Sequence, residues 1–457
     1  MDTYIDRHIE RFRGELESFL EIPSVSTDPD RAGDVRRCAS WLADRLRDGG
    51  ANEATLVPTA GHPIVLAQYV ASGDAPTVLV YGHYDVQPSS PDDLWTSPPF
   101  RPTVRGERIY ARGAADDKGQ VHMHLKALEA VLATTGRVPL NVTLLIEGEE
   151  EVGSPSLAKF VAENRRRLAC DAVLISDTTM LAPEAPAITI GTRGLVYAQV
   201  TVRGPRRDLH SGHYGGAVSN PANALGSIIG GLLDAGGRIT VPRFYDRVRA
   251  VTRREAESLR RMPPAEASVQ AQTGVPAAGG EAGIDALERI WFRPALDVNG
   301  MQSGFTGEGA KTIIPAEATA KISMRLVADQ DPDDVAQAFT DHVRGLAPAG
   351  VTVEAHVLQR ARPWSAEPDH PTFRVAEAAL AGAFGTAPVY TRVGGSIPIV
   401  PQLAEALGVP ILLLGFNLPD GNIHAPDESL HLGVYQRGIR ALAHVYRGLA
   451  AALYRSR

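Results

Sequence analysis

The alternation of short apolar segments with amphipathic helices is the feature that most constrains this fold. Runs with the length and β-branched content of buried strands occupy residues 64–69, 77–81, 141–146 and 172–175, and helical patterns occupy residues 4–21, 35–47, 122–133 and a segment ending near 166. This alternation is typical of an α/β layer structure with a largely parallel central sheet. Because ligands bind beyond the carboxyl ends of strands in such sheets, we expect a site among the residues that follow them.

Side chains that can bind metal ions gather at these positions. His83 and Asp85 follow one predicted strand and point to the same side of an extended segment. A Gly/Ala-rich turn before a helical pattern contains Asp116 and Asp117, and later strand ends are followed by Glu150, Glu151 and Asp177. Imidazole and carboxylate groups are the ligand set of zinc and related divalent ions. Paired carboxylates also fit two ions about 3.5–4 Å apart.

Each of these residues also has a simpler interpretation. The acidic run 147–151 could begin a charged helix, where the helix dipole favours acids. His83 and Asp85 could pack at a strand end, and His424, within residues 421–426, could be an ordinary loop histidine. Their combination at the strand-to-loop junctions of one sheet favours a metal centre.

The pattern changes near Gly191. Predicted strands at 195–202, 297–301, 318–327 and 351–358 and helices at 221–235 and 332–346 follow the β-α-β-β-α-β order of a ferredoxin-like sandwich, with a loop expected at 262–283. The α/β pattern returns after residue 371, with helices at 373–383 and 398–407, a strand at 410–414 and a last helix from 434. We therefore expect one domain from residues 1–191 and 366–457, with residues 192–365 inserted as an α+β lid or dimerisation domain.

Composition excludes several classes of partner. The net charge of −7 provides no basic surface for nucleic acid and no polybasic patch for a membrane. No segment is an uninterrupted apolar span, and the charged residues 2–13 do not predict a signal peptide. We expect a cytoplasmic protein in which Cys38 and Cys170 are reduced and buried.

Four motifs resemble those of the dinuclear-zinc amidohydrolases, a family that includes carnosine-type dipeptidases, carboxypeptidase G, aminoacylases and succinyl-diaminopimelate desuccinylase. They occur in order at residues 82–88, 113–119, 150–154 and 176–177. The segments 207–212, 309–312, 323–326 and 394–398 resemble the cytosolic dipeptidase branch most.

The resemblance implies two divalent metal ions per subunit, zinc with manganese or cobalt as alternatives. His83 and Asp177 would bind one ion, Glu151 and His424 the other, and Asp116 would bridge both. It further implies that Asp85 orients the His83 imidazole, that Glu150 is the general base, and that the peptide bond between Asp116 and Asp117 is cis.

The resemblance also implies substrate contacts in and beside the inserted domain. Thr312, Arg325 and Ser396 would contact substrate, with Arg325 holding a free carboxylate. The chain would form a homodimer through the inserted domain, with His210 reaching the partner's active site and stabilising the oxyanion.

The predicted function is that of a metal-dependent exopeptidase, which hydrolyses dipeptides or short peptides with a free C-terminal carboxylate through a hydroxide that bridges the metal ions. One alternative is a deacylase or desuccinylase that acts on N-acyl amino acids with the same chemistry. Another is a binding protein that retains the fold without catalysis. The presence of Glu150 argues against the latter, because a binding protein has no need of the base.

Overall fold

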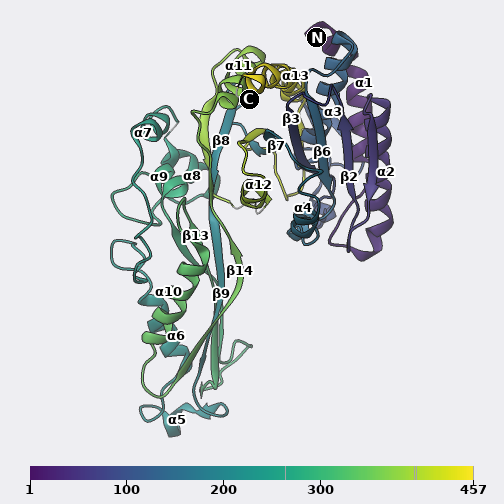
Figure 1. Cartoon of the computed structure of the whole chain (residues 1–457). Coiled ribbons are helices and arrows are strands. Elements are labelled where there is room, and N and C mark those ends of the chain that lie inside the picture. The colour runs from purple at the N-terminus through teal and green to yellow at the C-terminus, as the bar shows by residue number, and fades with distance from the viewer. Residues whose placement is uncertain (263, 396, 398, 456–457) are drawn as a thin grey trace. The chain divides into compact units, whose positions relative to one another are not determined.

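The structure, a computed structural model, describes residues 1–262, 264–395, 397 and 399–455. The chain forms two compact units (Figure 1). The first unit consists of Met1–Ile190, Ala366–Thr391 and Ile399–Arg457, and the second of Gly191–Ser365 and Arg392–Pro398. The catalytic role of one unit and the lid or dimerisation role of the other stay predictions.

A mixed sheet with the strand order β1-β2-β6-β3-β7-β17-β8 forms the centre of the first unit. The strands are β1 (Glu53–Val57), β2 (Ile64–Tyr69), β3 (Thr77–His83), β6 (Asn141–Glu147), β7 (Ala172–Thr179), β8 (Ala187–Thr192) and β17 (Ile411–Asn417), and β16 (Val389–Val393) pairs with β8. The central strands β6, β3, β7 and β17 are parallel, whereas β1, β2 and β8 join antiparallel. The predicted α/β class is confirmed, with antiparallel strands at the edges of a parallel centre.

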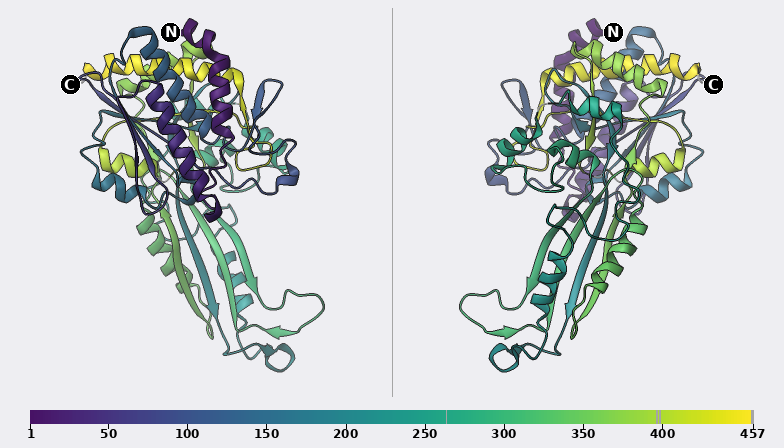
Figure 2. Two further views of the ribbon diagram at one scale, coloured as in Figure 1. Left: turned by 90° about the vertical axis from the view of Figure 1, so that its right-hand side faces the viewer. Right: turned by 90° about the vertical axis from the view of Figure 1, so that its left-hand side faces the viewer.

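Most helices of the first unit share one hydrophobic core with the sheet, and Figures 1 and 2 show them gathered along it. These are α1 (Asp2–Leu20), α2 (Ala32–Asp48), α3 (Lys118–Thr135), α11 (Pro371–Phe384) and α13 (Leu432–Tyr454). The stripe of α1 that includes Ile5, Phe12 and Leu16 is fully buried in this core. The shorter α4 (Leu157–Glu163) and α12 (Ile399–Leu407) contact each other outside the core.

A small sheet of the first unit brings together two segments that are distant in sequence. Its strands β4 (Thr103–Arg105), β5 (Arg108–Tyr110) and β18 (Ser429–His431) have the order β18-β5-β4. Ser429 pairs with Tyr110. Ala111, which follows β5, and Glu428, which precedes β18, therefore lie side by side.

The second unit contains a four-stranded antiparallel sheet with the order β11-β13-β9-β14. Its elements in chain order are β9 (Gly194–Arg203), α6 (Pro221–Gly230), β11 (Ala295–Ser303), β13 (Glu317–Leu326), α10 (Pro332–Gly345) and β14 (Thr352–Ala361). Alternate residues of β9, from Val196 to Val202, are buried against these helices in a separate core. Element order and sheet order are those of the predicted ferredoxin-like sandwich.

Shorter elements complete the second unit. They are β10 (Leu209–His210), α5 (Ser211–Tyr214), α7 (Arg253–Leu259), α8 (Ala265–Thr273), α9 (Ala286–Phe292), β12 (Ile313–Ile314) and β15 (Trp364–Ser365).

Three expectations need correction. The loop predicted at 262–283 contains α8, because its Ala, Glu and Gln residues are good helix formers and Gly274, with φ of 76°, ends the helix. The helix predicted at 221–235 ends at Gly230, where two consecutive glycines weaken it. Cys38 is buried as expected, but Cys170 is only half-buried, and both are free. Among the described helices, none is both long and apolar enough to cross a membrane.

Candidate metal centre

Two parallel strands of the first unit end in candidate ligands. His83 is the last residue of β3, and Asp177 lies near the end of β7. On β17, Leu414 faces Ser176 and Gly415 faces Thr178, so Asp177 is an extra residue that bulges from the ladder. A bulge re-aims a side chain. It also needs a glycine opposite, because a Cβ at Gly415 would lie 2.2 Å from the Thr178 carbonyl carbon.

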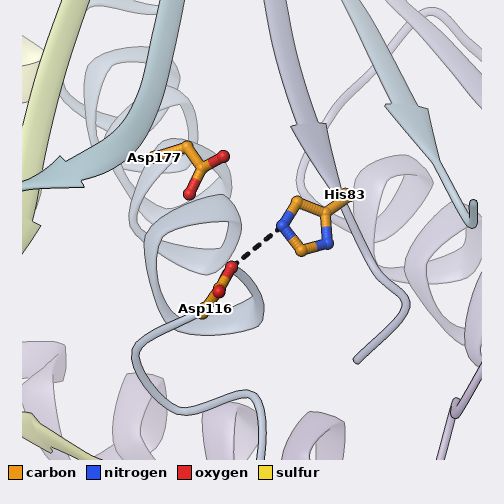
Figure 3. Close-up of side chains that lie close together, drawn as sticks. All are labelled: His83, Asp116 and Asp177. Atoms are coloured by element: carbon orange, nitrogen blue, oxygen red, sulfur yellow. Dashed lines mark hydrogen bonds and ion pairs between the residues drawn. The ribbon is translucent and has the colours of Figure 1, made fainter. Parts of the chain in front are cut away.

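His83 is held by its neighbours on both sides of the ring, and Figure 3 shows the side that faces Asp116. Its Nδ1 donates to the Asp85 carbonyl oxygen at 3.1 Å and lies 3.4 Å from the Asp85 carboxylate, while Nε2 lies 3.0 Å from Asp116 Oδ1. The Asp85 carboxylate also accepts hydrogen bonds from the backbone N–H groups of Glu150 at 3.2 Å and Glu151 at 3.1 Å. Asp85 therefore orients both the imidazole and the loop after β6.

Asp116 is shared by two groups of candidate ligands. Its Oδ1 faces His83, and its Oδ2 lies 2.9 Å from Nε2 of His424, which is also 3.3 Å from Glu151 Oε2. One group is His83, Asp116 and Asp177, the other Asp116, Glu151 and His424, and within each the ligand atoms lie within 4.8 Å of one another. The structure thus brings together the five side chains predicted to bind metal, and the Asp116–Asp117 peptide bond is cis.

The charges of the cluster are unbalanced. Burial and the Asp116 charge raise the pKa of Asp177 well above its usual value, and burial raises the pKa of Glu150 to about 7. Hydrogen bonds with Asp116 and Glu151 raise the pKa of His424 to about 10. Burial opposes ionisation of Asp116, but hydrogen bonds from both histidines lower its pKa. Carboxylates outnumber histidines here, and a divalent cation would offset their repulsion.

The donor set fits such a cation. Glu151 Oε1 is buried and has no hydrogen-bond partner within the described part of the chain, although Oε2 accepts from Gln87 Nε2 at 2.8 Å. A buried carboxylate oxygen without a donor is expected where a metal ion would bind. The N–O separations of 2.9 to 3.3 Å match neighbouring ligands around an ion with bonds of about 2.0–2.2 Å.

Sequence reasoning missed two side chains at this centre. Gln87, which contacts Glu151, lies in a motif but was assigned no role. Glu428, four residues after His424, is fully buried against the turn that carries Asp116. The position of Gln87 beside His83 and Asp85 in the sequence could have indicated its place at the site. Glu428 contacts Asp116 across more than three hundred residues, and the sequence contains no signal for that contact.

The predicted general base lies beside the cluster. Glu150 begins a short 3₁₀-helix, η3 (Glu150–Val152), and its backbone is held by Asp85. It is in neither ligand group. A carboxylate that is close to the ligands but not among them is free to transfer protons.

The predicted substrate residues are split within the second unit. His210 and Thr312 are exposed and adjacent, since His210 pairs with Ile313 and the Ser211 N–H donates to the Thr312 carbonyl at 3.1 Å. Arg325 lies near the far end of β13, where burial and the charge of Arg325 lower the pKa of Arg193 to about 10. Ser396 lies outside the described residues.

Comparison with known proteins gives a consistent result. Residues 79–448 match the description "Peptidase family M20/M25/M40". The chain is 33% identical over 94% of its length to the Cys-Gly metallodipeptidase DUG1 of Candida albicans, covering 93% of that protein. It is 30% identical over 98% of its length to the human Beta-Ala-His dipeptidase, covering 92% of that protein.

A solved structure agrees. The M20 family metallo-carboxypeptidase Sso-CP2 from Sulfolobus solfataricus superposes with a TM-score of 0.83 at 30% identity, covering 96% of this chain and 99% of that one. Together with the clustered N and O ligands, these matches show that the chain belongs to peptidase family M20/M25/M40 and is a metallopeptidase.

Proposed function

We propose that the protein is a metal-dependent exopeptidase that hydrolyses dipeptides, or short peptides with a free C-terminal carboxylate, with two divalent ions per subunit. The observation that carries the proposal is Asp116, whose two carboxylate oxygens face two different histidines. The donors favour zinc, with manganese or cobalt as alternatives. The similar proteins named a Cys-Gly metallodipeptidase and a Beta-Ala-His dipeptidase support a dipeptide substrate.

The chain's own residues divide the chemistry. His83, Asp116 and Asp177 would hold one ion, and Asp116, Glu151 and His424 the other. When bound, such ions polarise a carbonyl group and lower the pKa of water. Glu150 takes a proton from the attacking water and delivers it to the leaving amine, while Asp85 keeps the Glu150 backbone in place.

The split of the substrate residues supports a homodimer through the second unit. Because a strand rises about 3.4 Å per residue, Glu317 and Arg325 lie about 27 Å apart at the two ends of β13. His210 lies beyond the Glu317 end, next to Ile313. An extended dipeptide spans only about 7 Å. One substrate would therefore contact Arg325 of its own subunit through the carboxylate, and His210 of the partner subunit through the developing oxyanion.

We also infer a cytoplasmic location. The two cysteines are free, and one of them is buried as a thiol. Free thiols are typical of proteins from reducing compartments.

A substrate panel tests the proposal. The protein would be stripped of metal, reloaded separately with zinc, manganese and cobalt, and assayed on dipeptides, their C-terminally amidated forms, N-acetyl amino acids and N-succinyl-diaminopimelate. We expect hydrolysis of free dipeptides that chelation abolishes and metal restores. Faster turnover of the N-acyl substrates would assign the deacylase or desuccinylase alternative, and a folded, metal-loaded protein inert on every substrate would assign a binding function.

Complementation tests the dimer. His210→Ala and Glu150→Gln homodimers are each expected to be nearly inactive, because each lacks one group at every site. In a mixed dimer, one site combines an intact Glu150 with an intact partner histidine, so activity should return after subunit exchange. Inactive mixed dimers, or a fully active monomer, would contradict the role of His210 across the interface.

A further inference from the structure

Glu428 is a fully buried carboxylate whose two oxygens are both occupied by the turn that carries Asp116. Its Oε1 accepts from the backbone N–H groups of Ala115 at 2.8 Å and Asp116 at 3.0 Å. Its Oε2 accepts from Gly113 N–H at 3.0 Å and from Nη1 of Arg112 at 2.7 Å. Arg112 is itself only 1% exposed, and its Nη2 donates a hydrogen bond of 3.0 Å to the Pro88 carbonyl oxygen.

This carboxylate connects two segments of the metal centre. Glu428 directly precedes β18 and is four residues after His424, whereas its donors directly precede and include Asp116. The backbone continues the connection, because Ala111 N–H donates to the Glu428 carbonyl at 3.1 Å. Three backbone donors and a guanidinium on one carboxylate form a charge-assisted cluster that fixes direction as well as distance.

The loop that bears His424 needs such an anchor. Asn422, His424 and Asp427 all have left-handed backbone conformations, with φ of 53°, 60° and 58°. Non-glycine residues are uncommon in this region, although Asn, Asp and His adopt it more readily than other types, and three of them within six residues define an irregular loop. The Asp427 carboxylate connects the loop to Thr96, because it accepts hydrogen bonds from the Thr96 N–H at 3.0 Å and from the Thr96 hydroxyl at 2.6 Å. Glu428 fastens the inner side to the turn of Asp116.

We propose that Glu428 is a positioning residue that holds the carboxylate of Asp116 and the imidazole of His424 in one coordination geometry. It acts through the backbone of Asp116 and through the loop of His424, and it is not a ligand itself. This inference rests on the metal centre proposed above. Replacing one Glu428 oxygen with an NH₂ group sets a donor against the donors of Ala115 and Asp116 or against those of Gly113 and Arg112, and the two ligands that face each other across 2.9 Å lose their common support.

The test compares two carboxylates of the same loop region. Glu428→Gln keeps shape and volume but turns an NH₂ group toward donors. Asp420→Asn is the matched control, because Asp420 also pairs with an arginine, Arg108, at 2.7 Å but has a side chain that is 73% exposed. Metal-free proteins would be titrated with Co²⁺ and Zn²⁺, with metal content, affinity and the visible Co²⁺ spectrum recorded.

For Glu428→Gln we expect affinity weaker by about 10–100-fold and an altered Co²⁺ spectrum, as for other groups that orient ligands. Asp420→Asn should match the wild type in both. A folded Glu428→Gln protein with wild-type affinity and spectrum would overturn the proposal. Wild-type protein that binds no metal would instead contradict the metal centre itself.

Glu428→Asp covers the case in which the glutamine variant does not fold. It keeps the charge but shortens the side chain, so it should fold more readily and still weaken Co²⁺ binding and change the spectrum. Unchanged binding would overturn the proposal. Amide hydrogen exchange of the metal-free wild type is a further readout, since the N–H groups of Gly113, Ala115 and Asp116 should be protected, and rapid exchange would contradict the cluster.

Discussion

The two candidate ligand groups share Asp116 but differ in how they are supported. His83 and Asp85 are fully buried, and Asp85 holds the imidazole from behind. His424 has a side chain that is 50% exposed and sits on a loop with left-handed residues. We call these the His83 side and the His424 side. The first is built into the ends of sheet strands, whereas the second depends on a surface loop.

This difference has consequences for metal binding. His424 is exposed, so solvent can replace it stepwise as a ligand, whereas the His83 side has a fully buried histidine and two half-buried carboxylates and is less open to solvent. Buried donors also bind a cation in a lower effective dielectric, which strengthens the attraction. We therefore expect the His83 side to retain its ion longer.

Asp116→Asn should have the largest effect, because it weakens both sides at once. Metal content should fall on both sides, and kcat/KM should fall by at least about 10³-fold, since single charge-stabilising groups contribute about 10²–10³. Metal analysis and peptide hydrolysis measure the two results. Asp420→Asn, the same chemical change on an exposed residue, should leave both unchanged. A variant with full metal content on one side would show that Asp116 does not join them.

Glu150→Gln should separate catalysis from metal binding. Turnover should fall by about 10²–10⁴-fold, because the proton shuttle is lost, while both sides keep their ions. The readouts are kcat and metal content measured on the same preparation. Glu149→Gln is the matched control at the neighbouring position. Glu149 is in neither ligand group, and its Oε1 accepts a hydrogen bond of 3.3 Å from the His62 N–H. A Glu149→Gln variant that loses more turnover than Glu150→Gln would move the base to Glu149.

Graded chelation tests the comparison directly. As the chelator concentration rises, metal content should pass through a plateau at about one ion per chain, because the His424 side releases its ion first. His424→Ala should start at that plateau, and the ion it retains should resist chelation as the second wild-type ion does. His83→Ala should leave only a readily removed ion. Release of both ions in a single step would show that the two sides do not differ.

Gly415→Ala should have the smallest effect and should act on the His83 side. The added Cβ would lie 2.2 Å from the Thr178 carbonyl carbon, so the bulge at Asp177 must shift. We expect a loss of about 1–3 kcal/mol in the free energy of unfolding, typical of overpacking, and weaker retention of the slow ion. Urea unfolding of the metal-free protein measures the change in the free energy of unfolding.

Gly382→Ala is the control for this change. It lies within α11, and a Cβ there would meet no atom within 4 Å. Replacing an unstrained helix glycine should stabilise the protein by about 0.4–1 kcal/mol. Equal effects of the two substitutions would show that the bulge does not require Gly415.

Whether the position of a candidate ligand could be predicted depends on the kind of element that carries it. His83 and Asp177 follow apolar strand segments, and parallel strands place their carboxyl ends at one edge, so their proximity was predictable. His424 lies on a loop that follows no such rule, and its role as a ligand was predicted from the family resemblance. The bulge that aims Asp177 was also invisible, because it depends on how close β17 approaches β7.

The second unit shows the same limit. The alternating pattern of β9 and the β-α-β-β-α-β order were enough to predict the sandwich, because one face of each strand must be buried. The separation of His210 from Arg325 followed only from the pairing of β10 with β12 and from the length of β13. The partner subunit proposed above rests on the same pairing.

By itself, the sequence determined the α/β class, the ferredoxin-like unit and the residue types of the metal centre, because periodicity and strand-end position are local properties of the chain. The tertiary structure decided which oxygen of Asp116 faces which histidine, that Glu151 Oε2 lies beside His424 while Oε1 has no partner among the described residues, and that Glu428 fastens two distant segments. These side-chain contacts join residues up to 316 positions apart. Such contacts form only when the sheet and the helices that cover it have packed, since no local signal encodes them.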